Sequence, residues 1–167
     1  MATAADSAKE MKRGGWPGTG QKVGVLEAEI DLAVVSAELV AQGDGVLATG
    51  DIIQCLNLPQ GTMVLRAGFE ITETVVGVAA LPLSLGITGG DTDHFVGEVD
   101  IGSSTSYVLT DYVPTKQGTG AYIIGEGAAG ATSDTIDLLC GTVTATSITA
   151  GKLRVFAVVA DVASMEG

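Results

Sequence analysis

The sequence predicts an all-β protein, a jelly-roll-like antiparallel β-sandwich of about eight strands with an extended N-terminal arm. Apolar and polar residues alternate with period two through most of the chain, as they do where successive side chains point to opposite faces of a sheet. Turn residues separate these segments at short intervals, and glycine makes up 24 of the 167 residues, about twice its usual share. Short strands at such spacing are typical of a sandwich or jelly roll.

Residues 1–22 differ in composition from the rest and are expected to form a flexible basic N-terminal arm, with residues 23–167 as one β-sandwich domain. The arm carries four cations and two acids, whereas residues 23–167 carry four cations and eighteen acids. A solvated terminus is one interpretation. The other is an arm that becomes ordered on a partner, because tryptophan is enriched where proteins bind one another. The arm residues expected to bind a partner are Lys9, Lys12, Arg13 and Trp16.

The first strand is expected to begin at Val23. Glu27, Glu29 and Asp31 alternate there with apolar residues, so their carboxylates form a row on one face, about 7 Å apart. This acid row is interpreted either as a solvated acidic face or as a partner-binding surface that receives the basic arm of a neighbouring subunit. Residues 33–41 either form a short helix or continue the first strand.

The middle of the chain predicts several more strands. Segments 50–57 and 62–74 are joined by Leu58-Pro59-Gln60-Gly61, and in the second one Met63, Leu65, Ala67, Phe69 and Ile71 are expected to share a face. A strand over residues 81–87 contains Pro82, which predicts either an edge position or a bulge beside the start of the strand. The remaining expected strands cover residues 95–100, 107–113, 121–124 and 136–140.

The last expected strand, Lys152–Val162, is apolar on both faces. Leu153, Val155 and Ala157 lie on one face, and Phe156 and Val158 lie on the other. Such a strand is either central in a two-layer body or half-buried against another subunit.

Composition and charge exclude several classes of function. The net charge of −12 argues against nucleic acid as a partner, because a polyanion requires a basic surface. No apolar run is long enough to cross a bilayer, and the first twenty residues lack the apolar core of a secretory signal, so we expect a protein made in the cytoplasm with no membrane partner. Cys55 and Cys140 lie inside apolar alternation and are expected to be buried thiols.

No catalytic, cofactor-binding or metal-binding residues are predicted, and no cofactor is expected. His94 is the only histidine, and no serine lies in a nucleophile-elbow motif. Asp91 and Asp93 lie in a loop rich in oxygen ligands, but their spacing matches no EF-hand, so an acidic turn is favoured over a calcium site. The chain is therefore not expected to be an enzyme.

Several segments resemble small virion proteins of tailed bacteriophages, over roughly residues 23–163. The similarity is carried by the segments Thr49-Gly50-Asp51-Ile52-Ile53-Gln54, Asn57-Leu58-Pro59, Thr62-Met63-Val64-Leu65, Gly68-Phe69-Glu70, Asp91-Thr92-Asp93, Phe95-Val96 and Ala150-Gly151-Lys152-Leu153-Arg154-Val155. Such proteins are capsid cement or decoration proteins, often jelly rolls that sit as trimers on the head.

The resemblance implies a structural virion protein on the capsid surface, which binds itself as a homotrimer and binds the major capsid protein, and which cements the shell. Three alternatives remain open: a tail, fibre or head–tail connector component; a carbohydrate-binding jelly-roll module; and a β-sandwich hydrolase that uses acidic residues.

Overall fold

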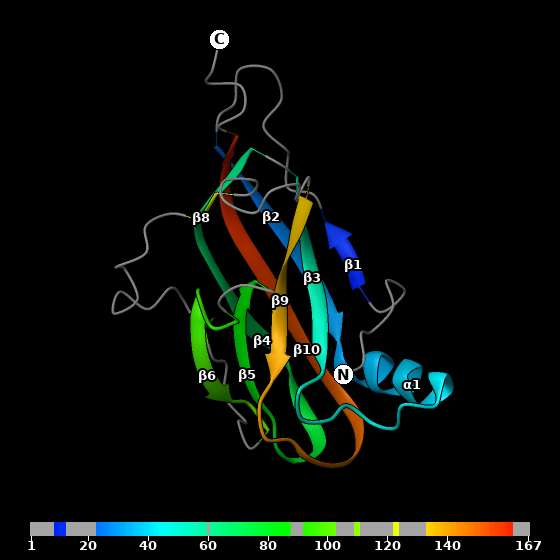
Figure 1. The fold of residues 1–167 in the computed structure, drawn as a ribbon. Helices are drawn as coiled ribbons and strands as arrows, with labels where there is room; N and C mark the ends of the chain where they lie inside the picture. The colour runs from blue at the N-terminus through cyan, green and yellow to red at the C-terminus, as the bar shows by residue number, and fades with distance from the viewer. Residues whose placement is uncertain are drawn as a thin grey trace.

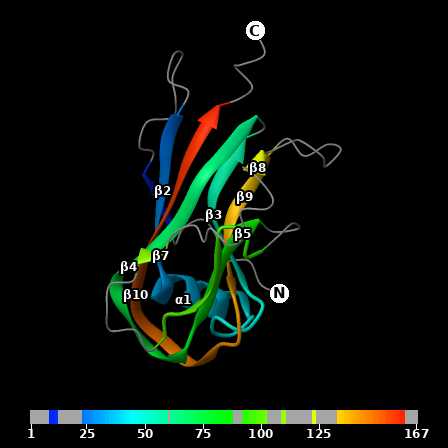
Figure 2. The same ribbon diagram turned by 90° about the vertical axis from the view of Figure 1, so that its left-hand side faces the viewer.

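The computed structural model describes residues 9–12, 23–59, 61–87, 92–102, 109–110, 122–123 and 133–161. In this part of the chain the strands form two facing antiparallel sheets, and one short helix lies beside them (Figures 1 and 2). The strands are β1 (Lys9–Lys12), β2 (Val23–Asp31), β3 (Ile52–Pro59), β4 (Thr62–Ala80), β5 (Pro82–Ile87), β6 (Val96–Asp100), β7 (Leu109–Thr110), β8 (Tyr122–Ile123), β9 (Ser133–Cys140) and β10 (Thr144–Asp161).

The strand order is that of a jelly roll. The larger sheet has the order β1-β2-β10-β4-β7, with β8 also paired to β4, and the smaller sheet has the order β3-β9-β5-β6. From β2 onward the antiparallel pairs are nested: β2 pairs with β10, β3 with β9, β4 with β7, and β5 with β6. The chain is thus a long hairpin rolled into two layers, which is how a jelly roll closes its core. The prediction of a jelly-roll-like sandwich is confirmed.

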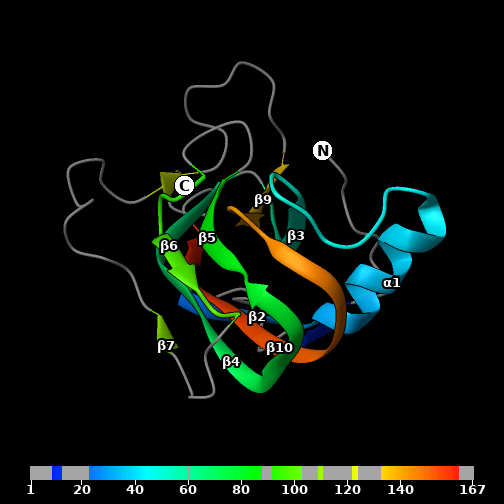
Figure 3. The same cartoon turned by 90° about the horizontal axis from the view of Figure 1, so that it is seen from below.

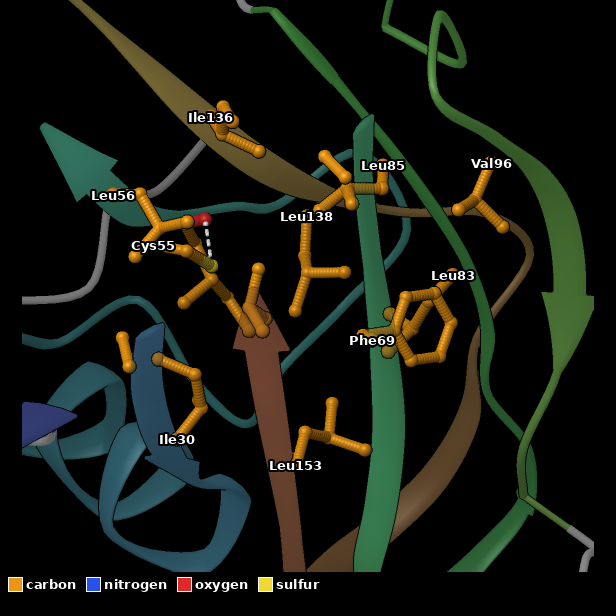
Figure 4. Close-up of a cluster of buried hydrophobic side chains, with 14 of the residues drawn as sticks. Ile30, Cys55, Leu56, Phe69, Leu83, Leu85, Val96, Ile136, Leu138 and Leu153 are labelled. Carbon is orange, nitrogen blue, oxygen red and sulfur yellow. Dashed lines mark hydrogen bonds between the residues drawn. The ribbon is translucent and has the colours of Figure 1, made fainter. Parts of the chain in front are cut away.

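The core lies between the two sheets and is mainly aliphatic. Figure 4 shows Phe69 and Leu153 of the larger sheet pointing toward Leu83, Leu85 and Leu138 of the smaller one. All five side chains are fully buried. A fully buried side chain of this size contributes about 1.5–3 kcal/mol relative to an exposed one, so this layer is the main source of stability.

Both cysteines are free and buried, as predicted. The Cys55 thiol donates a hydrogen bond to the Ile53 carbonyl at 3.1 Å. Burial, with a smaller contribution from the nearby Asp51 carboxylate, raises the pKa of Cys140 to about 12. The thiolate is the reactive form of cysteine, so at neutral pH Cys140 is an inert core residue.

Residues 32–42 form a helix rather than an extension of the first strand. Helix α1 (Leu32–Gln42) begins directly after β2 and ends at Gly43, whose φ of 91° requires a residue without a Cβ. The amide of Gly43 donates to Val40, and the amide of Asp44 donates to Leu39. The helix packs against β2 and β10 and projects to one side of the sandwich, as Figure 3 shows from below.

Two β-bulges change what simple alternation predicts. A bulge at Cys55 places both Cys55 and Leu56 in the core. A second bulge, at Leu65, makes Leu65 exposed and buries Val64, so the prediction that Met63 and Leu65 share the face of Ala67 is wrong. An extra residue in one strand shifts the phase of every residue on one side of it.

The edge position predicted for Pro82 is also wrong, because β5 lies between β9 and β6. The alternative is confirmed: Pro82 is the first residue of β5, and a bulge follows between Leu83 and Leu85. The first position of a strand tolerates the missing N–H of proline.

Strands β4 and β10 are longer than predicted, and they remain paired as they bend toward the smaller sheet (Figure 2). The bend contains several register shifts, and Gly77 and Gly151 lie there with φ angles of 93° and 137°. A Cβ at Gly77 would overlap the backbone oxygen of Ser147, and a Cβ at Gly151 would lie 3.0 Å from the Cα of Val75. The two strands can therefore cross here only where one of them has no side chain.

We predict that Gly77→Ala lowers the free energy of unfolding by more than about 2 kcal/mol. The left-handed backbone alone costs an L-residue about 1–2 kcal/mol, and the overlap with Ser147 adds to it. Chemical denaturation measures the change. Gly97→Ala is the matched control, because a Cβ there meets nothing within 4 Å, and it should change stability by less than about 0.5 kcal/mol. Equal stabilities for the two variants would contradict the described crossing.

Candidate functional site

The outer face of the larger sheet has β10 at its centre, because β10 lies between β2 and β4. Along β10, Leu153, Val155 and Ala157 point into the core with no exposed surface. The alternate residues Lys152, Arg154, Phe156 and Val158 therefore point outward. None of these four is fully buried, which makes this face a surface with both charged and apolar side chains.

The half of this face nearest α1 is charged and is neutralised within the chain. Arg154 of β10 stands between Glu29 of β2 and Glu70 of β4. It forms an ion pair with Glu70, whose side chain is only 5% exposed, so a carboxylate that burial would destabilise has a charged partner. One row further, Lys152 Nζ lies 3.7 Å from Glu73 Oε2 in an exposed pair worth at most about 1 kcal/mol.

The other half of the face is apolar. Val23, Val25 and Leu65 are 55%, 44% and 45% exposed, and the register places half-buried Phe156 and Val158 on the strand between them. We call these five residues the apolar patch. They come from three adjacent strands, so they form one contiguous surface, of the kind that marks a protein interaction site when it occurs on a soluble domain.

Charge is also unevenly distributed over the body. Residues 23–167 contain four cations, and three of them, Arg66, Lys152 and Arg154, lie on this outer face. Arg66 pairs in register with Val158, at the edge of the apolar patch. The body contains eighteen acids, and the cations that the structure describes in it lie on the same face as the exposed apolar side chains.

The structure places part of the predicted arm beside the predicted acid row, in the same chain. Strand β1 pairs with β2, with Lys9 opposite Ile30 and Lys12 opposite Glu27. Glu27 and Glu29 are half-buried and lie on the outer face, opposite Phe156 and Arg154 of β10. Arg13 and Trp16 lie outside the described residues.

The apolar patch was not identified from the sequence, although one signal for it was present. Val23 and Val25 lie at alternate positions of the same strand as Glu27 and Glu29. Alternate side chains of a strand share a face, so the valines and the glutamates lie on the same face. The outward residues of β10 were identified as apolar. Leu65 was not, because the bulge that exposes it leaves no local pattern.

His94 and Asp93 lie in the turn that precedes β6. His94 is buried, and its ring packs edge-on against Phe95, with the ring centroids 4.8 Å apart. The hydroxyl of Ser84, on β5, donates a hydrogen bond to the carbonyl oxygen of Thr92. Among the described residues no three or more His, Cys, Asp or Glu side chains gather as metal ligands, and Asp91 lies outside these residues. The described helix is too short to cross a membrane.

Asp31, the last residue of the acid row, has a role inside its own chain. Its Oδ1 accepts hydrogen bonds from the amides of Ala33 and Val34, at 3.0 and 3.2 Å. These amides belong to the first turn of α1 and have no partner within the helix, so Asp31 is the N-cap.

We predict that Asp31→Ala lowers the free energy of unfolding by about 1 kcal/mol, the usual cost of losing a cap. Asp31→Asn keeps a side-chain oxygen acceptor and should retain most of the stability. Glu29→Ala, in the same row, is the control and should change stability by less than about 0.5 kcal/mol. Thermal and chemical denaturation would measure all three, and an Asp31→Ala variant as stable as Glu29→Ala would refute the capping role.

Comparison with known proteins gives a similarity of fold and none of sequence. No protein-family model matches the chain, and no curated protein matches its sequence. The chain is similar in structure to a chain of the cyanophage Pam1 capsid asymmetric unit, with a TM-score of 0.57 and 17% identity over 89% of this chain and 93% of that one. It is also similar to a chain of the capsid of Ralstonia phage GP4, with a TM-score of 0.56 and 12% identity over 90% and 91%. At these identities the similarity establishes a shared fold.

Proposed function

We propose that this chain is a structural virion protein, a cement protein that binds the outside of a phage capsid as a homotrimer and stabilises the shell. The observation that carries the proposal is the shared fold with chains of two phage capsids, which extends over nearly the whole length of both partners in each comparison. The segments that resemble small virion proteins, apart from Asp91, lie within the described part of the same sandwich or in its turns.

The described surface favours binding over catalysis. Its distinctive feature is a broad face with an apolar half and a charged half, and His94 is a buried side chain that packs edge-on against Phe95. A strongly acidic body also suits a protein that is needed in many copies, because net charge keeps proteins soluble at high concentration.

The proposed partners are other copies of this chain and the major capsid protein. A cement protein stabilises a shell by mass action, because its binding site exists only on the assembled lattice and each bound copy favours that state. Trimer formation strengthens the attachment, since binding through one subunit raises the effective concentration of the other two. No cofactor or reaction is needed for this role.

The arm is proposed as a partner contact through Lys9, Lys12, Arg13 and Trp16, with Glu27, Glu29 and Asp31 as the acid row that it meets. The pairing of β1 with β2 supports this assignment, because it places Lys12 opposite Glu27. The same register is open to the arm of a neighbouring subunit, since antiparallel pairing depends on the two strands and not on the loop between them.

Phage particles that lack the protein, with and without the purified chain added back, would test the cement role. We expect many copies distributed over the outer surface, and a rise in the temperature at which packaged DNA becomes accessible to a dye. The rise should saturate with bound protein. Attachment at a single vertex or along a tail would instead identify another virion component. If the protein bound the capsid without changing the temperature of DNA release, it would be a decoration protein, and the cement role would be excluded.

Removal of residues 1–22 would test the arm separately. The core residues in the part of the chain that the structure describes all lie beyond Val23, so the shortened chain should fold with only a small fall in its thermal midpoint. Its affinity for capsids should fall at least tenfold, as measured by co-sedimentation. As a matched pair, Lys12→Glu places like charges opposite Glu27 and should weaken binding, whereas adding Glu27→Lys should restore it. Equal binding by the full and shortened chains would exclude the arm as a contact.

A further inference from the structure

We propose that the apolar patch binds residues 13–16 of its own chain, with the indole of Trp16 on Val23 and Val25. These two valines are 55% and 44% exposed on the outer face of β2. The proposed occupant belongs to residues 13–22, which lie outside the described residues and connect the end of β1 to the start of β2. The inference concerns the free chain and does not depend on the capsid role.

The register of β1 determines where this segment starts. Strand β1 runs antiparallel to β2, with Lys9 opposite Ile30 and Lys12 opposite Glu27. Each further residue of an antiparallel strand lies opposite the preceding residue of its partner. The same register, continued by four residues, brings Trp16 opposite Val23. Residues directly opposite each other share a face of the sheet, so this position is on the face of the apolar patch.

The length and composition of the connection suit this position. With Trp16 opposite Val23, residues 17–22 remain to reverse the chain, and connections of up to about six residues are the commonest. These residues include Pro17, Gly18 and Gly20, which are typical of turns. The continued strand would therefore end directly after Trp16, where a proline follows it.

The side chains of the segment are complementary to the patch. The continued register brings Gly14 opposite Val25, and a glycine leaves the space above that valine free for the indole. An aromatic side chain reaches the diagonal neighbour in an antiparallel pair, so Trp16 can cover both valines. The contact is favourable because it removes apolar area of the indole and of the valines from water.

The arm of the same chain is favoured over that of a neighbour because it is already held nearby. Three residues separate Trp16 from Lys12, which the pairing of β1 places opposite Glu27. Such a short tether gives the indole a high effective concentration at the patch. In the proposed function Trp16 meets a partner, so partner binding would first have to release it from the valines.

The test is the fluorescence of the full chain. Trp16 is the only tryptophan, so its emission and its quenching by acrylamide report on this residue alone. We expect the wild type to emit at shorter wavelength than the denatured chain. Its quenching constant should be at least threefold lower, because a docked indole is shielded from the quencher.

Val25→Glu places a charge under the indole and should raise the quenching constant close to that of the denatured chain. Leu65→Glu is the matched control: Leu65 is 45% exposed on the same face, but β10 separates its strand from β2, so quenching should stay at the wild-type value. Val23→Glu is a second variant, at the more exposed valine, and should act as Val25→Glu does. Circular dichroism and thermal midpoints would confirm that each variant is folded.

A wild-type chain whose Trp16 is quenched as strongly as in the denatured chain would overturn the inference. So would equal quenching constants for Leu65→Glu and the two valine variants. A contact within one chain is independent of concentration, so protection that is lost on dilution would assign the arm to a neighbouring copy and also overturn it. No capsid is present in this experiment, so its failure is distinguishable from failure of the cement role.

Discussion

The position of β10 between β2 and β4 is the constraint on which the rest of the structure depends. The strand is hydrogen-bonded along both edges, so it connects the two halves of the larger sheet. Its inward residues Leu153 and Val155 form the middle of the core, and its outward residues Arg154 and Phe156 form the middle of the outer face. Core packing and the candidate binding surface are therefore two sides of one strand, and a shift of β10 by one residue would exchange them.

The outer face is divided in a way that suits a protein with partners. In its charged half, cations on the central strand lie between acids on both neighbours, and the chain neutralises itself. In its apolar half, the exposed valines and Leu65 are not covered by the described part of their own chain, and only the arm or another molecule could bury them. This division is what the proposed role in assembly requires, because one half of the face maintains the sheet and the other half is available for contact.

Much of the fold was predictable because period-two alternation is a local property, and it located nearly every strand. What the pattern could not show is non-local or depends on an added residue. The bulge at Leu65 reversed the faces of the residues before it, and the bulge at Cys55 placed two consecutive side chains in the core. Asp31 continued the alternation of Glu27 and Glu29, so its second role as a helix cap was hidden by the first pattern. The pairing of β1 with β2 within one chain likewise could not be predicted from the sequence of either segment alone.

The nested order of the strands also has a consequence for synthesis. Strands β2 and β4 do not neighbour each other in the sheet. Each pairs with β10, which comes last in the sequence among the described strands. A nascent chain therefore holds two unfinished edges until β10 emerges from the ribosome. The pairing of the earliest strand of the sandwich with the latest closes a loop of more than a hundred residues, and such non-local topologies fold slowly. The larger sheet is therefore complete only after nearly the whole chain has been synthesised.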